Sequence, residues 1–231
     1  MAKKLTKRQK AWAEIDREKH YELPEAVKLL KKNATAGFDE TVEIAVNLNL
    51  DTRKADQQVR GMVALPHGTG KTVRIAVFAK GDAATAAEKA GADVVGAEDL
   101  AEKVEKGFLD FDAVVATPDT MPLMGRIGKI LGPKGLMPNP KLGTVTPNPA
   151  KIVKDLKAGM IEYRAEKRGV VHVVAGKASF SEKQLEENIR SFYETIKAAK
   201  PAGVKSIYMN SVAVSSTMGP GIKLDFASLN G

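Results

Sequence analysis

The chain has 231 residues, and its 36 Lys and Arg outnumber 28 Asp and Glu to give a formal net charge of +8. It contains no Cys, which excludes disulfide bonds, thiolate metal sites and cysteine nucleophiles. The positive charge favours a partner that carries phosphate, and an aromatic content of only 5% favours structured RNA over single strands stacked on aromatic side chains.

The first predicted elements are a helix and a half-buried strand. The first ten residues carry five cations and are interpreted as a solvated or phosphate-touching arm. We expect a helix at 24–32, because Pro24 suits a first turn and Val27 and Leu30 fall on one side. Residues 41–50 alternate as a strand does. Its buried face comprises Val42, Ile44, Val46, Leu48 and Leu50, and its exposed face Thr41, Glu43, Asn47 and Asn49.

From Lys71 the pattern changes to alternating strands and helices. Strands are expected at 73–79, 94–96 and 113–116, with helices at 83–90 and 100–106. This alternation predicts a parallel sheet flanked by helices, a compact Rossmann-like unit. The segment from 120 to 154 has no acid and is dense in Pro and Gly, so we expect an ordered, basic surface loop. Either a structural crossover or a contact surface fits it.

The last third returns to strands around one long helix. Strands at 161–166 and 170–175 flank Lys167, Arg168 and Gly169, which predicts a hairpin. A helix is expected at 181–199, with a capping box from Ser181 to Gln184. A strand at 206–215, a Gly-rich turn at 218–221 and a short strand at 222–226 follow. From the residues alone, the hydroxyls beside this turn fit either RNA contact or local turn bonds.

Sheet-rich ends around a middle α/β segment predict an inserted domain. The fold class is α/β, with an α+β first domain built on an antiparallel-rich split β-α-β sheet and an inserted Rossmann-like α/β second domain. The first domain is expected to comprise residues 1–67 with 160–231, and the second residues 68–159. Two crossings at Gly-containing sites would form a hinge.

No catalytic, cofactor or metal site is predicted. Gly68-Thr69-Gly70-Lys71-Thr72 resembles the end of a phosphate-binding loop, but the Gly required five residues before Gly70 is replaced by Leu65. The residues His20, His67 and His172 have no metal-ligand spacing. We also expect no membrane span and no cleaved leader, which favours a cytoplasmic protein. A nucleotide-dependent enzyme built on the middle segment and a basic protein-interaction module remain the alternatives to an RNA-binding protein.

Four motifs carry a resemblance. They are residues 37–41 (GFDET), 132–140 (GPKGLMPNP), 176–180 (GKASF) and 216–220 (STMGP), spread in order along nearly the whole chain. Together they resemble the bacterial family of large-subunit ribosomal protein number one, the family of the mobile stalk beside the tRNA exit site.

The resemblance implies a structural protein of the large ribosomal subunit, without enzymatic activity and monomeric when off the ribosome. Its implied partners are large-subunit ribosomal RNA, exit-site tRNA and the leader of its own messenger RNA, whose translation the family represses. The first domain grips the ribosomal RNA. The RNA-binding residues implied by the resemblance are Phe38, Thr41, Glu43, Lys167, Arg168, Gly169, His172, Ser211, Thr217, Met218 and Gly219.

Overall fold

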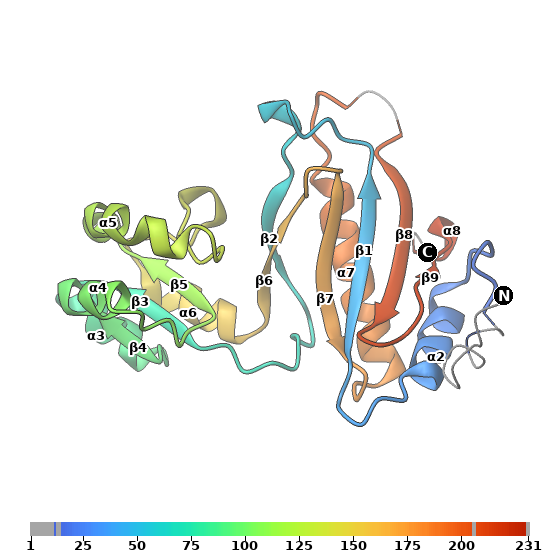
Figure 1. Cartoon of the computed structure of the whole chain (residues 1–231), viewed down its shortest axis with the longest axis horizontal. Coiled ribbons are helices and arrows are strands. Elements are labelled where there is room, and N and C mark those ends of the chain that lie inside the picture. Colours follow the sequence, from blue (N-terminus) through green and yellow to red (C-terminus); the bar gives the residue numbers. More distant parts are fainter. Residues whose placement is uncertain (1–11, 13–14, 205–206, 230–231) are drawn as a thin grey trace, which may run out of the picture. The chain divides into compact units, whose positions relative to one another are not determined.

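Residue 12, residues 15–204 and residues 207–229 are described by the computed structural model of the chain (Figure 1). Two units, Met1–Gly70 with Glu162–Gly231 and Lys71–Ile161, are called here the first and the second unit. The chain crosses between them after Gly70 and after Ile161, where sequence analysis expected crossings after residues 67 and 159. The predicted basic arm at residues 1–10 lies outside the described residues.

A four-stranded antiparallel sheet, in the order β7-β1-β8-β9, forms the centre of the first unit. Its strands are β1 (Thr41–Leu48), β7 (Val170–Lys177), β8 (Met209–Ser216) and β9 (Ile222–Lys223). The predicted alternation is confirmed, since Val42, Ile44, Val46 and Leu48 are buried. The prediction for Leu50 is wrong: its N–H turns back to the Leu48 carbonyl at 3.0 Å, so β1 ends at Leu48 and Leu50 is half-buried beyond it.

Two helices cover the buried face of this sheet. These are α2 (Leu23–Asn33) and α7 (Glu182–Ala198), and Figure 1 shows α7 behind β7 and β1. The predicted capping box of α7 is confirmed, with Ser181 Oγ accepting from Gln184 N at 3.3 Å. The strand predicted at 222–226 ends at Lys223, and a short helix, α8 (Phe226–Leu229), follows.

The predicted hairpin at 161–175 is correct in its turn and wrong in its strand pairing. Strand β6 (Met160–Arg164) pairs with β2 (Arg60–Ala64), while β7 pairs with β1. A single bridge between Ala165 and Val171 joins the two segments. The reason lies in the core: Tyr163 is buried and its ring meets that of Phe192 of α7 edge-on, at a centroid distance of 6.1 Å. This packing draws β6 away from β7.

The second unit contains a three-stranded parallel sheet in the order β4-β3-β5, which confirms the predicted α/β pattern. Its strands are β3 (Ile75–Phe78), β4 (Val94–Gly96) and β5 (Ala113–Ala116), and its helices are α3 (Asp82–Lys89), α4 (Glu98–Glu105), α5 (Met121–Leu131) and α6 (Pro149–Lys157). With antiparallel and parallel sheets both present among helices, the α/β fold class is confirmed.

The expectation of a loop from 120 to 154 is wrong over much of its length, because α5 and part of α6 lie within it. Met124, Ile127 and Leu131 are fully buried at helical spacing and anchor α5 in the core. Pro149 stands in the first turn of α6, where a missing N–H costs little. Short 3-10 turns complete the fold at Ala55–Gln57, Pro118–Thr120 and Pro140–Leu142.

Candidate nucleic-acid interface

The face of the β7-β1-β8 sheet opposite α2 and α7 is called here the open face. Side chains alternate across a strand, so the residues between the buried positions of β1 point to this face. The strand register places them in cross-strand rows. These rows are Val174–Glu43–Ser215, His172–Ala45–Ala213 and Val170–Asn47–Ser211.

The open face combines small side chains with hydrogen-bonding groups. Ala45 and Ala213 lie opposite each other in its middle row, so the backbone there is close to the surface. Glu43 and His172 are exposed, and Ser211 is partly exposed. Hydroxyl, imidazole and carboxylate groups can bond sugar hydroxyls and base edges, which suits recognition of RNA by shape. Three predicted residues from three strands therefore share one face.

The turn after β8 is tied to the start of β1. The Thr41 N–H donates to Thr217 Oγ1 at 2.9 Å, and the Thr217 N–H donates to the Thr41 carbonyl at 3.0 Å. Lys177 Nζ donates to Thr41 Oγ1 at 2.9 Å, which adds a cation that sequence analysis did not predict. Thr217, Met218 and Gly219 thus stand at the same end of the sheet as Thr41.

A buried carboxylate holds two proposed contact segments together. Glu40 is only 1% exposed, and its Oε1 accepts from Ala36 N at 2.9 Å while its Oε2 accepts from Met218 N at 3.0 Å. Phe38 is 55% exposed and Met218 47% exposed, so both present large apolar surface to solvent. Glu40 was not among the predicted site residues, although its even-numbered position continues the buried series of Val42.

At the other end of β1 lies the turn with Lys167, Arg168 and Gly169. Gly169 is buried, its φ is +76°, and a Cβ there would stand 2.6 Å from the Leu48 carbonyl oxygen. The Leu48 N–H donates to the Gly169 carbonyl at 2.9 Å. Gly169 therefore fixes the turn against β1, and the side chains of Lys167 and Arg168 are left exposed. All the predicted RNA-binding residues therefore lie on the four-stranded sheet that contains β1 or in the segments beside it.

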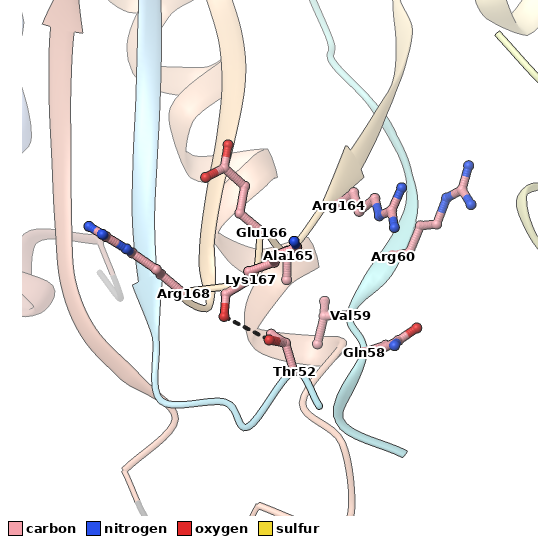
Figure 2. A pocket seen from close by; sticks show the side chains of 9 residues that line it. All are labelled: Thr52, Gln58, Val59, Arg60, Arg164, Ala165, Glu166, Lys167 and Arg168. Carbon is pink, nitrogen blue, oxygen red and sulfur yellow. Dashed lines mark hydrogen bonds between the residues drawn. The ribbon is translucent and has the colours of Figure 1, made fainter. Parts of the chain in front are cut away.

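A recess of about 850 Å³ opens beside this turn (Figure 2). Its lining residues are Thr52, Gln58, Val59, Arg60, Arg164, Ala165, Glu166, Lys167 and Arg168, all of the first unit. Figure 2 shows the Thr52 hydroxyl bonded to the Lys167 carbonyl, and that bond measures 2.8 Å. Of these lining residues, only Lys167 and Arg168 were predicted as site residues from the sequence.

The segment that resembles a phosphate-binding loop has a different role. Asn188 of α7 donates from Nδ2 to the Gly68 carbonyl at 2.9 Å and accepts from His67 N at 3.1 Å. Lys71 Nζ pairs with Asp112 at 2.6 Å. The residues after Lys71 lead into strand β3, whereas a phosphate-binding loop leads into a helix whose N–H groups face the phosphate. These bonds instead hold the chain to α7 just before it leaves the first unit.

Within the described part of the chain, no group of three or more His, Cys, Asp or Glu side chains is placed to hold a metal ion. Across the same residues, no helix is both long enough and apolar enough to span a bilayer.

The sequence model of the ribosomal protein L1p/L10e family matches residues 30–220, which include both units. The chain belongs to this family. As an L1p/L10e protein it is a component of the large ribosomal subunit that binds ribosomal RNA and serves translation, on the ribosome in the cytoplasm. The family is one of structural ribosomal proteins.

Proposed function

We propose that the first unit holds ribosomal RNA of the mobile stalk on its open face. The observation that carries this proposal is the common location of the predicted residues. They come from segments far apart in the chain, yet they follow β1 from the Thr217 turn at its start to the Lys167 turn at its end. This continuous polar strip is suited to a folded RNA segment.

Each part of this polar strip is proposed to make a different kind of contact with the RNA. Around Thr217, Met218 and Gly219, hydroxyl and backbone groups bond sugar hydroxyls, and the exposed Phe38 packs against sugar or base surfaces. Glu43 accepts from a 2′-hydroxyl or a base amino group. Lys167 and Arg168 contact phosphate. Gly169 acts indirectly, since its backbone holds the turn against Leu48.

The second unit is proposed to contact exit-site tRNA as the stalk moves. The crossings that join it to the first unit lie close to Gly70, with φ +72°, and Gly159, with φ +105°. These left-handed conformations favour glycine and suit the ends of a hinge. We further propose that the protein represses its own translation by binding a messenger RNA leader that resembles the ribosomal site. It acts as a monomer when off the ribosome.

The rival function is a nucleotide-dependent enzyme on the second unit. At the carboxyl end of β3, where such a fold binds its ligand, Thr120 Oγ1 donates to the Phe78 carbonyl at 2.9 Å and is fully buried. Lys71, the residue that a phosphate loop would need, is paired with Asp112. Both contacts support the RNA-binding proposal over the enzyme.

The proposal is tested by binding of the full chain to fragments of large-subunit ribosomal RNA, with unrelated structured RNA as competitor, across a salt series. We expect one fragment to bind tightly, to resist the competitor and to lose affinity only modestly with salt. Equal, weak binding to every RNA that collapses with salt would contradict the proposal and leave only a basic surface. ATP hydrolysis, measured on the same preparation, tests the rival.

A further inference from the structure

The recess beside the Lys167 turn concentrates positive charge. Arg60 comes from β2, Arg164 from β6, and Lys167 with Arg168 from the turn between β6 and β7, whereas Glu166 is the one acid in the lining. Figure 2 shows Arg60 and Arg164 on the neighbouring strands of the two-stranded sheet, whereas the Arg168 side chain extends from the turn toward the opposite side of the view. Two chain segments that are far apart in the sequence, at Arg60 and at residues 164–168, therefore line one opening with four cationic residues.

Most of this charge is not neutralised within the protein. Arg60 Nε pairs with Glu162 Oε1 at 2.7 Å. Among the described residues, Arg164, Lys167 and Arg168 form no ion pair with a carboxylate. Like charges gathered around one opening repel each other, and an entering anion relieves that repulsion. The recess therefore attracts anions in general, whatever their chemical identity.

The open face has the opposite character. Its cross-strand rows contain apolar, hydroxyl, amide and imidazole side chains, with Glu43 as the one acid. Contacts of this kind bond RNA without displacing many counterions, whereas cations that neutralise phosphates release them. The salt-dependent part of RNA binding is therefore expected to come from cations outside the open face, and the recess gathers several cations of the first unit.

The recess is also wide enough for a polymer backbone. Its volume of about 850 Å³ is far above that of a single phosphate group, and the small side chains of Val59 and Ala165 leave it unfilled. Thr52 and Gln58 add uncharged hydrogen-bonding groups. Because Lys167 and Arg168 belong both to the recess and to the RNA strip along β1, one RNA strand can pass from one to the other.

We infer that this recess is a phosphate-binding subsite for the sugar-phosphate backbone of the bound RNA, and that Arg60 and Arg164 carry much of the salt dependence of binding. The open face supplies the salt-insensitive, selective contacts. This inference rests on the proposed RNA-binding function and adds to it two cations, Arg60 and Arg164, together with a division of roles.

The first test removes charge from the recess. The double variant Arg60→Gln/Arg164→Gln is compared with Lys28→Gln/Lys183→Gln, whose lysines are exposed on α2 and α7 at the opposite side of the sheet. Affinity for the selected ribosomal RNA fragment is measured across a salt series. We expect the recess variant to bind more weakly at low salt and its log–log salt slope to flatten by roughly 0.7 to 0.9 for each phosphate that is no longer neutralised. A slope equal to that of the control variant overturns the inference.

The second test should increase affinity. Replacing Glu162 with Gln removes the carboxylate that competes with phosphate for Arg60, so Glu162→Gln should bind the fragment several-fold more tightly at low salt. The increase should disappear at high salt. Glu194→Gln, an exposed charge change on α7, is the matched control and should show no increase. Unchanged or weaker binding by Glu162→Gln contradicts the inference.

The two proposals fail in different ways. If the unaltered chain prefers its ribosomal fragment while both recess variants behave as their controls, the phosphate subsite is wrong and the RNA-binding function stands. If the unaltered chain shows no preference for any fragment, the proposed function fails and the subsite fails with it.

Discussion

Glu40 is the residue on which the positions of two proposed RNA-contact segments depend. Its carboxylate is buried and accepts from the backbone of Ala36, before Phe38, and from that of Met218. Burial of a carboxyl group is costly unless hydrogen bonds compensate it, and these two N–H groups contribute to that compensation. Glu40 therefore positions the proposed interface from inside the fold.

Replacing Glu40 with Gln should disturb this arrangement. A glutamine offers one oxygen, so either Ala36 N or Met218 N would face an NH₂ group in place of its acceptor. We expect the free energy of unfolding to fall by ~1 to 3 kcal/mol and RNA affinity to fall with it. Urea unfolding and fragment binding measure both. Glu43→Gln, at an exposed position, is the control and should leave stability unchanged; equal stability of Glu40→Gln would refute the positioning role.

Gly169 offers a second residue-scale prediction. Alanine there would meet the Leu48 carbonyl oxygen at 2.6 Å and would also adopt a positive φ. Gly135 has nearly the same φ, +73°, with no atom within 4 Å of an added Cβ, so Gly135→Ala isolates the cost of the backbone conformation. That cost is about 1 to 2 kcal/mol. Gly169→Ala should destabilise the protein by more than its control in urea unfolding, and equal destabilisation would contradict the steric role of Leu48.

The difference between Glu40 and its neighbours shows what the sequence reveals about single residues. The alternation of β1 identified Val42, Ile44 and Val46 as buried, because a period of two is visible in the chain itself. Nothing in the sequence distinguishes a buried glutamate such as Glu40 from an exposed one. Its partners, Ala36 N and Met218 N, are backbone groups that meet only in the folded state.

For helices, strands and turns, the sequence predicted local conformation more reliably than it predicted which strands pair with each other. The turn with Lys167 and Gly169 was predicted from its own residues, whereas the pairing of β6 with β2 follows from the packing of Tyr163 on α7. Gly61 of β2 belongs to the same arrangement, since a Cβ there would lie 2.6 Å from the Tyr163 hydroxyl. Such contacts join residues far apart in the chain and have no local pattern.

The junction of β3 and β5 allows a prediction about pH. Asp112 accepts from Lys71 Nζ at 2.6 Å and from Arg74 N at 3.1 Å, and the bond from Lys71 with that from the Arg74 backbone lowers the pKa of Asp112 below its usual 3.8. A lowered pKa in the folded state stabilises the fold at pH values above the unfolded pKa, and that stabilisation is lost as pH falls through the folded pKa. Asp112 therefore contributes fully at pH 7.

Asp112→Asn should accordingly reduce the free energy of unfolding by roughly 1 kcal/mol at pH 7. The difference from the unaltered chain should be smaller at pH 3 than at pH 7, because this stabilisation is lost as the pH falls from 3.8 toward the lower pKa of the folded state. Urea unfolding at the two pH values measures it, with Asp119→Asn at an exposed position as the control. A difference that is the same at both pH values would show that the carboxylate charge is not involved.

For the whole molecule, the insertion of one unit into the other was visible as a change of pattern. Apolar alternation near Val42 gives way to strand and helix units after Lys71, and the α/β fold class follows from this change. The helix α5 remained hidden, because Pro122, Gly125 and Gly128 disguise a helical series of buried residues. The recess also escaped prediction, since Arg60 and Arg164 are brought together only by the pairing of β2 with β6.

The central claim is that the first unit, at the Thr217 end of its sheet, holds the ribosomal RNA. The most direct test is the affinity of Thr217→Val for the selected fragment, beside Thr217→Ser, which keeps the hydroxyl, and Lys134→Gln in the second unit. We expect Thr217→Val to weaken binding by ~1 to 3 kcal/mol, with little change in the other two. Unchanged affinity of a folded Thr217→Val, or a large drop in affinity for Lys134→Gln, would contradict the account.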